Sequence, residues 1–334
     1  ESYDLEDERR SGMLERRIRR IVGDAPYEIV WCSVYRAHSR IADRMAAGRV
    51  LLAGDCAHLV TPFGARGLNS GVQDAENAAW KIAYALRGYA PSRLVDSYDE
   101  ERRAAAVENL AITTATMEFL APETPEQVAH RARALDDAAS HVAARERVDS
   151  GRLAEPYWYV DSSLTTPDAS RPFAGRPPKG STPPPAPGVL LPDVITRRDK
   201  ESIPLRTLAR AGLLILVGPQ VDTVTLDAAV RGLVAHPVRV LDPEMGVREA
   251  LGMRDDELWL IRPDAYIAAI VRDVDGVVAA LSRLLGRLSA TDPGVNSRFS
   301  AALSYHPRRQ PGSARPKECL GVGKRRSRSS RGRT

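Results

Sequence analysis

The sequence predicts a mixed α/β protein with two folded regions. Three observations carry this prediction: a strand, loop and helix pattern from Gly48 to Leu86, a proline-rich segment from Pro167 to Pro192, and a second alternation of apolar runs after it. At 334 residues the chain is long enough for two hydrophobic cores. The first folded region is placed at residues 1–120 and the second at residues 193–290. Between them lie a helical extension at 121–166 and the proline-rich linker at 167–192, and a basic tail follows at 291–334.

The segment before Gly48 is predicted to hold a helix and a strand. Residues up to Arg20 are charged, with Leu14 and Ile18 at helical spacing. From Tyr27 to Tyr35 the side chains alternate between two sets, as in a strand.

The next stretch is predicted to be a strand, a glycine loop and a helix. The short apolar run Val50–Ala53 is typical of a buried strand, and Gly54–Asp55 ends it. A loop with Gly64 and Gly67 follows. Apolar residues then recur at helical spacing from Leu68 to Leu86, so the helix is expected to begin near Gly67.

This order of elements has a chemical meaning. The Asp55 carboxylate lies where open α/β sheets bind ligands, and it can accept hydrogen bonds from ribose or ribityl hydroxyls. The loop glycines let the backbone approach a flat ligand, and the start of the helix favours an anion. An ordinary strand–loop–helix connection is the alternative.

The string from Gly48 to Leu86 resembles the second flavin fingerprint of the single-component FAD-dependent aromatic hydroxylases. The matching positions are Gly54-Asp55-Cys56-Ala57-His58, Pro62, Gly64-Ala65-Arg66-Gly67-Leu68-Asn69, Asp74-Ala75-Glu76-Asn77 and Trp80-Lys81. The resemblance implies FAD, held by Asp55 at the ribityl chain and by Pro62, Gly64, Ala65, Arg66, Gly67, Leu68 and Asn69 near the isoalloxazine ring. Two positions depart from the pattern: Cys56 replaces an alanine, and Ala65 replaces a glycine, which requires a negative φ at residue 65.

The resemblance also implies an activity. Members of this family hydroxylate phenolic or other aromatic substrates with O2 and NAD(P)H, and the cofactor carries the oxygen chemistry. Trp31, Tyr35 and Arg36 lie on the strand that faces substrate in related enzymes, so they are candidates for the substrate pocket. No catalytic acid or base is assigned. The sequence contains no GxGxxG, and we therefore expect a chain that lacks the first half of an FAD-binding, Rossmann-like domain.

Several residues near the fingerprint have competing interpretations. Asp74 and Asn77 are expected to hydrogen-bond the loop, and His58 to pack beneath it. Arg66 either reaches the flavin or substrate rim or is simply exposed. A thiol nucleophile formed by Cys56 and His58, or a metal site that includes His58, is disfavoured because a third group is missing.

Long helical stretches follow the fingerprint. Ser92 to Thr116 carries apolar residues at helical spacing, and residues 122–150 continue as an alanine-rich helix. The charges of Asp99-Glu100-Glu101-Arg102-Arg103 are interpreted as a solvated face. The nine prolines from Pro167 to Pro192 predict an extended, poorly ordered linker, with an SH3-type ligand as the less favoured alternative.

The region after the linker is predicted to alternate strands and helices. The expected elements are strands at 213–217, 237–241, 258–261 and 266–271 and helices at 226–234, 247–251 and 275–288. The order β-α-β-α-β-β-α resembles a thioredoxin-like domain. Because no cysteine lies between Cys56 and Cys319, thiol exchange is excluded, and packing or a homodimer interface is expected instead. A non-catalytic interaction or oligomerisation module is therefore the main alternative function.

Composition narrows the remaining classes. The chain has no apolar run long enough to span a membrane and no apolar leader at Glu1, so we expect a cytoplasmic protein. Three cysteines without a CxxC pair support neither a disulfide framework nor a zinc site. The net charge of +5 comes from the basic tail after Pro307, which is more typical of disorder than of nucleic-acid binding.

Overall fold

The structure is a computed structural model that describes residues 4–34, 38–148, 155–177, 181–198, 201–234 and 238–285. Its first elements are the helices α1 (Leu5–Arg10) and α2 (Met13–Val22). The helical prediction is confirmed, but the expected single helix is divided at Ser11–Gly12. The predicted strand from Tyr27 is wrong over the described residues 27–34, which form no regular element. Val30 and Trp31 are 91% and 81% exposed, so this segment has neither the partner strand nor the buried face that would stabilise a strand.

Two small antiparallel ladders surround the glycine loop. Strand β1 (Arg40–Ile41) pairs with β4 (His58–Leu59), and β2 (Ala46–Ala47) pairs with β3 (Val50–Leu51). The prediction of a buried strand at Val50 is wrong in one respect, because Val50 is 61% exposed and β3 has a single neighbouring strand. The β2–β3 hairpin is anchored at its base by Asp99, which accepts hydrogen bonds from the Met45 and Ala46 N–H groups.

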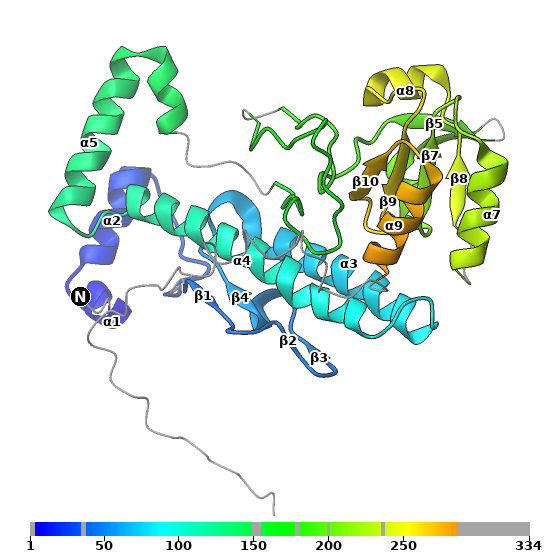
Figure 1. Cartoon of the computed structure of the whole chain (residues 1–334). Coiled ribbons are helices and arrows are strands. Elements are labelled where there is room, and N and C mark those ends of the chain that lie inside the picture. The colour runs from blue at the N-terminus through cyan, green and yellow to red at the C-terminus, as the bar shows by residue number, and fades with distance from the viewer. Residues whose placement is uncertain are drawn as a thin grey trace, which may run out of the picture. The chain divides into compact units, whose positions relative to one another are not determined.

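Two long helices, α3 (Arg66–Leu86) and α4 (Arg93–Leu120), lie side by side and support this region (Figure 1). Helix α3 has an inverted distribution of side chains. Its polar residues Ser70, Asp74, Asn77 and Lys81 are buried, while Leu68 and Leu86 at the ends of its apolar stripe are each 82% exposed. The helical spacing was therefore predicted correctly, but the apolar stripe is not the face that this helix buries.

The chain after α4 is helical as far as residue 147. Helix α5 (Pro125–Ser140) begins with a capping box, in which the Thr124 hydroxyl accepts from the Gln127 N–H and the Gln127 side chain accepts from the Thr124 N–H. The 3-10 helix η3 (Val142–Arg147) follows. This confirms the helical prediction up to residue 147 and adds a break at His141.

The second region is built on a four-stranded sheet with the strand order β10-β9-β7-β8. Strands β7 (Leu214–Val217) and β8 (Arg239–Leu241) are parallel, whereas β9 (Leu258–Ile261) and β10 (Ile267–Val271) are antiparallel to their neighbours. The helices between and after them are α7 (Thr223–Leu233), α8 (Met245–Leu251) and α9 (Val274–Leu284). The predicted order β-α-β-α-β-β-α is confirmed, and the likeness to a thioredoxin-like domain stays a prediction.

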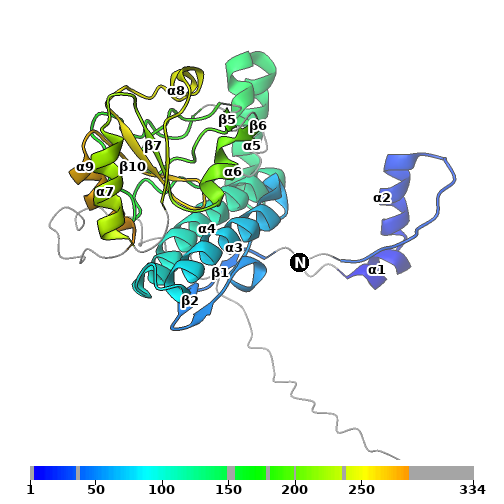
Figure 2. The same cartoon turned by 90° about the vertical axis from the view of Figure 1, so that its right-hand side faces the viewer.

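Both faces of this sheet are covered, so its strands read as continuous apolar runs. Helices α7 and α9 lie on one face (Figure 2), where Leu226 and Leu281 pack with Ile215. Helix α8 covers the other face together with α6 (Leu205–Arg210), which the sequence analysis missed along with the hairpin of β5 (Ile195–Arg198) and β6 (Glu201–Pro204). The hydrophobic core between the sheet and helices α7 and α9 also includes Trp80 and Tyr84 of α3, so the sheet and α3 share buried surface.

The proline-rich segment is not a free spacer throughout, which corrects the expectation of a poorly ordered linker. The Leu191 N–H donates to the Ala265 carbonyl (2.9 Å), and the Gly188 N–H donates to the Ile267 carbonyl (2.7 Å). Gly188 has φ +86°, and a Cβ there would lie 2.5 Å from the backbone of Val160, so only glycine fits this crossing. The end of the segment forms an isolated antiparallel bridge between Leu190 and Tyr266, just before β10.

Residues 286–334, including the predicted basic tail, lie outside the described residues. Within the described ranges, none of the helices combines the length and the hydropathy that crossing a bilayer would need.

Candidate cofactor site

The predicted acid lies on a tight turn next to α3. Residues Gly54–Cys56 form a 3-10 turn after β3, with Gly54 at φ +61°, and the Asp55 side chain is exposed. A Cβ added at Gly71 of α3 would lie 3.3 Å from the Gly54 Cα. The two glycines therefore let the helix cross directly over the turn and place Asp55 beside the first turns of α3.

The glycine loop reaches α3 through two left-handed residues. Gly64 has φ +75° and Ala65 has φ +53°, so the expectation of a negative φ at Ala65 is wrong. Ala65 is the N-cap of α3, where the chain passes from the 3-10 turn Phe63–Ala65 into the helix. Alanine has no side-chain oxygen, so the N-cap residue makes no side-chain capping hydrogen bond to the first turn of α3.

The strain at Ala65 gives a stability prediction. We expect Ala65→Gly to raise the free energy of unfolding by about 1 kcal/mol, because glycine adopts φ +53° without the Cβ clash of the left-handed region. Urea denaturation followed by circular dichroism measures the change. Ala79→Gly, at an exposed interior position of the same helix, is the matched control and should lower it by about 1 kcal/mol. A loss in both variants would contradict the assignment of strain to Ala65.

The structure places the other predicted cofactor residues in two groups. Exposed or partly exposed positions around the turn and the helix start are Asp55, Pro62, Gly64, Ala65, Gly67, Leu68 and Asn69. Arg66 is different, since it is 2% exposed and its Nη1 donates to Asn109 Oδ1 of α4 (2.8 Å). The interpretation of Arg66 as simply exposed is wrong, because its guanidinium is buried and joins α3 to α4. A contact of Arg66 with the flavin or the substrate stays a prediction.

The predicted substrate residues are not gathered into a pocket by the described part of the structure. Trp31 is 81% exposed in a segment without regular structure. Tyr35 and Arg36 lie outside the described residues. Their assignment to the substrate pocket stays a prediction.

A buried carboxylate holds the Gly54–Asp55 turn in place. Asp74 Oδ2 accepts hydrogen bonds from the Gly54 N–H (2.9 Å) and from His58 Nε2 (2.7 Å), and its Oδ1 pairs with Arg102 Nε (2.6 Å). Burial alone would raise the pKa of Asp74, but the His58 hydrogen bond, the Arg102 charge and the Gly54 N–H outweigh it and lower the pKa below its usual value. The predicted supporting roles of Asp74 and His58 are confirmed.

The charged stretch of α4 is a buried network, which corrects its interpretation as a solvated face. Glu101 and Arg102 are 2% and 0% exposed. Glu101 pairs with Lys81 (2.7 Å) and with Arg262 (2.5 Å), which comes from the β9–β10 turn. Asn77 also donates to Glu101 (2.7 Å), instead of to the loop as predicted. Burial would raise the pKa of Glu101, but the charges of Arg262 and Lys81 lower it.

A signal for this network was present in the sequence. Arg102 follows Leu94 and Tyr98 at helical spacing, so it lies on the buried stripe of α4, where both apolar residues are at most 1% exposed. An arginine on such a stripe needs a buried acid. The acid that pairs with Arg102 is Asp74 of α3. The buried acid of α4, Glu101, pairs with Arg262, which lies about 160 positions further along the chain, and no local pattern reveals that pair.

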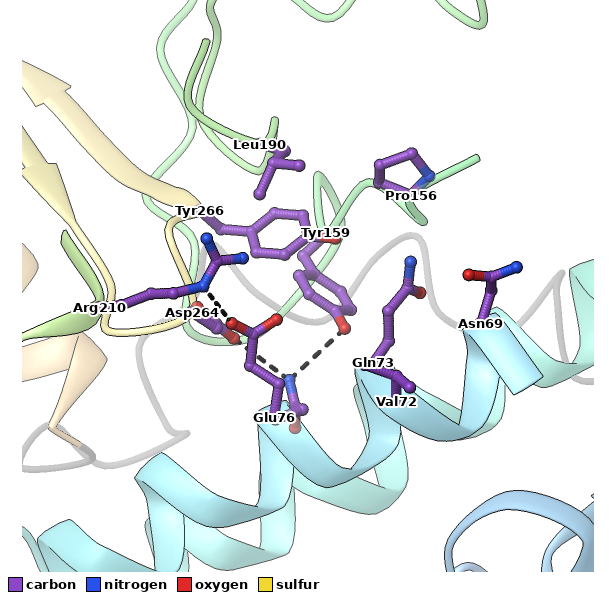
Figure 3. Close-up of a pocket in the computed structure, with 11 residues that line it drawn as sticks. Asn69, Val72, Gln73, Glu76, Pro156, Tyr159, Leu190, Arg210, Asp264 and Tyr266 are labelled. Carbon is purple, nitrogen blue, oxygen red and sulfur yellow. Dashed lines mark hydrogen bonds and ion pairs between the residues drawn. The ribbon is translucent and has the colours of Figure 1, made fainter. Parts of the chain in front are cut away.

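A separate pocket of about 200 Å³ lies between α3 and the second region (Figure 3). Asn69, Gln73 and Glu76 line it from α3, and Tyr159 and Tyr266 form an aromatic wall with ring centroids 4.5 Å apart. Arg210 Nε pairs with Glu76 at 2.6 Å. The pocket includes Asn69 but not Asp55, and its volume is below the roughly 300 Å³ at which small-molecule sites begin. Of the predicted cofactor residues, the lining of this pocket contains Asn69 alone.

No group of three or more potential metal ligands occurs in the part of the chain that the structure describes. Cys32 and Cys56 are free thiols there.

Comparison with known families matches two segments of the chain. Residues 3–113 match the family described as FAD binding domain, and residues 184–287 match the family described as aromatic-ring hydroxylase, C-terminal. The first match contains the whole turn and the start of α3. The second contains the four-stranded sheet and Arg262.

Curated relatives match most of the chain. A 4-methyl-5-nitrocatechol 5-monooxygenase of Burkholderia sp is 32% identical over 270 residues, which are 76% of this chain and 46% of that protein. A tetracenomycin A2 monooxygenase-dioxygenase of Streptomyces glaucescens is 30% identical over 294 residues, which are 81% of this chain and 47% of that protein. The chain thus spans about half the length of these relatives.

Solved structures with the same fold hold flavin. Aklavinone-11 hydroxylase in a complex with FAD and aklavinone superimposes with a TM-score of 0.60 and 26% identity, over 85% of this chain and 54% of that one. The rebeccamycin biosynthetic enzyme RebC with reduced flavin gives a TM-score of 0.63 and 25% identity, over 82% of this chain and 52% of that one.

Proposed function

We propose that this chain holds the flavin end of FAD at the Gly54–Asp55 turn and the start of α3. Its two matched segments relate it to the FAD-dependent aromatic-ring hydroxylases. The reaction proposed for the protein is hydroxylation of a phenolic or other aromatic small molecule with O2 and NAD(P)H. FAD, when bound, supplies the electron transfer and the oxygen chemistry. The residues of this chain bind it, orient it and stabilise its charge.

The observation that carries this proposal is an exposed acid beside an uncapped helix start. The Asp55 carboxylate is free to accept hydrogen bonds from ribityl hydroxyls, while its backbone is fixed because Asp74 binds the Gly54 N–H at 2.9 Å. The N-cap residue of α3 makes no side-chain capping hydrogen bond, and the first-turn N–H groups together with the helix dipole favour the negative charge of a reduced flavin ring.

These residues fit the isoalloxazine and ribityl part of FAD, and we assign nothing to the ADP part because the sequence has no GxGxxG. Trp31, Tyr35 and Arg36 remain the proposed substrate residues. The alternative of a purely non-catalytic module is less favoured, because it gives no reason for an exposed acid and an uncapped helix start at one turn.

FAD titration of the purified chain tests the proposal. We expect Asp55→Asn to weaken FAD binding about tenfold, or about 1.4 kcal/mol, because an amide replaces the charged acceptor of the ribityl hydrogen bonds. Quenching of flavin fluorescence gives the dissociation constant. Asp136→Asn, an exposed acid on α5, is the matched control and should bind FAD like the unaltered chain. Equal affinities of both variants, or no saturable binding by any of the three proteins, would contradict the assignment.

A further inference from the structure

We propose that Arg262, in the turn between β9 and β10, is a positioning residue for the Gly54–Asp55 turn. It acts through a continuous chain of buried contacts that runs along α4 and ends at Asp74. The inference gives the second region a role in shaping the cofactor site, and in this respect it rests on the proposed function. The contacts themselves are independent of any cofactor.

The first link fixes Glu101 of α4. Arg262 Nη1 and Nη2 bind the two carboxylate oxygens of Glu101 at 2.5 and 2.8 Å, and both side chains are fully buried. Arg262 also binds Asp264 through Nε (2.9 Å) and Nη2 (2.7 Å). A guanidinium that is held by two carboxylates in a forked geometry has little freedom to rotate. Glu101, and with it this turn of α4, is therefore held against the β9–β10 turn.

The second link passes through the next residue of α4. Arg102 binds Asp74 through Nε (2.6 Å) and donates from Nη1 to the Tyr159 hydroxyl (2.8 Å). The Tyr159 ring lies against the Arg262 guanidinium, 4.9 Å from its centroid to Cζ. Tyr159 is thus held at its hydroxyl by one arginine and at its ring face by the other. The two arginines form one packed unit, so a displacement of Arg262 reaches Arg102 by two routes.

The third link holds the residues on both sides of Asp55. Asp74 Oδ2 binds the Gly54 N–H (2.9 Å) on one side of Asp55 and His58 Nε2 (2.7 Å) on the other. The Asp74 and Arg102 side chains are both 0% exposed, so no water replaces a contact that is lost. If Arg102 shifts, the carboxylate that anchors both ends of the turn shifts with it.

Arg171, in the proline-rich segment, provides a matched control because it binds the second region. It binds both oxygens of Glu257 (3.0 and 2.8 Å) and stacks on Trp259 at 5.3 Å, so it has the same forked and stacked chemistry as Arg262. Its side-chain contacts are with Gly252, Glu257 and Trp259, which lie in the second region and not in α3 or α4. A general weakening of this region would follow from either substitution, whereas an effect on the turn should follow only from Arg262.

Hydrogen exchange of the full chain, without added flavin, is the first test. In Arg262→Lys the charge stays but the fork is lost, and we expect a peptide across residues 51–60 to exchange about tenfold faster. A peptide within α5 should be unchanged. Arg171→Lys should leave the 51–60 peptide unchanged. Tyr159→Phe removes only the hydroxyl bound by Arg102 and is the milder variant to use if Arg262→Lys does not fold. It should also accelerate exchange at the turn.

The result that would overturn the proposal is equal exchange of the turn in the unaltered chain and in the folded Arg262→Lys or Tyr159→Phe variant, or equal acceleration by Arg171→Lys. A second arm uses FAD: Arg262→Lys should bind it several-fold more weakly than Arg171→Lys and alter the visible circular dichroism of the bound flavin. An unchanged spectrum and affinity, with FAD bound, would also count against positioning. If no protein binds FAD, the proposed function fails while the exchange result still decides the role of Arg262.

Discussion

Replacing Arg262 by methionine is expected to lower the free energy of unfolding by about 3–5 kcal/mol, the cost of leaving a buried charge without its partner. Glu101 would keep Lys81 but lose its forked partner, and Asp264 would lose the cation that binds it at 2.7 Å. All of these side chains are at most 3% exposed, so water does not replace the lost contacts. Urea denaturation followed by circular dichroism measures the change.

Arg210→Met is the control for this experiment. Arg210 and Glu76 are 2.6 Å apart, a distance like those in the buried network, but their side chains are 49% and 34% exposed. Exposed pairs contribute about 0–1 kcal/mol, so this variant should lose less than about 1 kcal/mol. Similar small losses in both variants would mean that Arg262 is not paired in a water-excluded environment.

The second large effect is a rise in stability between pH 8 and pH 9.5. Burial lowers the pKa of Lys81 from its usual 10.5 to about 8, with the repulsion of Arg262 adding to burial and the attraction of Glu101 opposing it. Above pH 8 the folded protein loses the Lys81 proton while the unfolded chain keeps it until about pH 10.4. The unfolded state then binds more protons, so the free energy of unfolding rises by up to about 1.4 kcal/mol per pH unit.

The window ends where tyrosines begin to titrate. Burial raises the pKa of Tyr159 to about 12, whereas an unfolded tyrosine ionises near pH 10, so stability falls again above that pH. Urea midpoints measured at pH 7.5, 8.5 and 9.5 test the prediction, with Lys81→Met as the control that removes the rise. A flat profile in the unaltered chain, or the same rise in Lys81→Met, would contradict a buried lysine with a lowered pKa.

Sequence reasoning identified the second region well because its signals are local. Strand β9 was predicted with its observed bounds, Leu258–Ile261, since four consecutive apolar residues are typical of a strand covered on both faces. A tight turn joins β9 to β10, where the Ala265 N–H donates to the Arg262 carbonyl (2.9 Å), and Pro263 suits its second position. The hairpin of β5 and β6 was not predicted, because Ile195–Arg198 is half charged and has no apolar alternation that would indicate a strand.

A turn at Gly54–Asp55 was predicted from local signals and is present, but the contacts that support it were only half visible in the sequence. Asp55 and Gly64 follow from the strand, loop and helix pattern, and Asp74 lies where the fingerprint puts an acid. The partnership of Glu101 with Arg262 spans 161 positions and has no local signal. The strand expected at Tyr27 shows the opposite limit: alternation alone does not form a strand when no neighbouring strand pairs with it.

The most direct test of the cofactor site is to add FAD to the isotope-labelled chain and to follow every backbone amide. We predict saturable shifts that are largest at Asp55 and over residues 64–69, because these groups would contact the ribityl chain and the flavin ring. Shifts confined to the pocket lined by Gln73, Tyr159 and Tyr266, with the turn unaffected, would contradict this assignment.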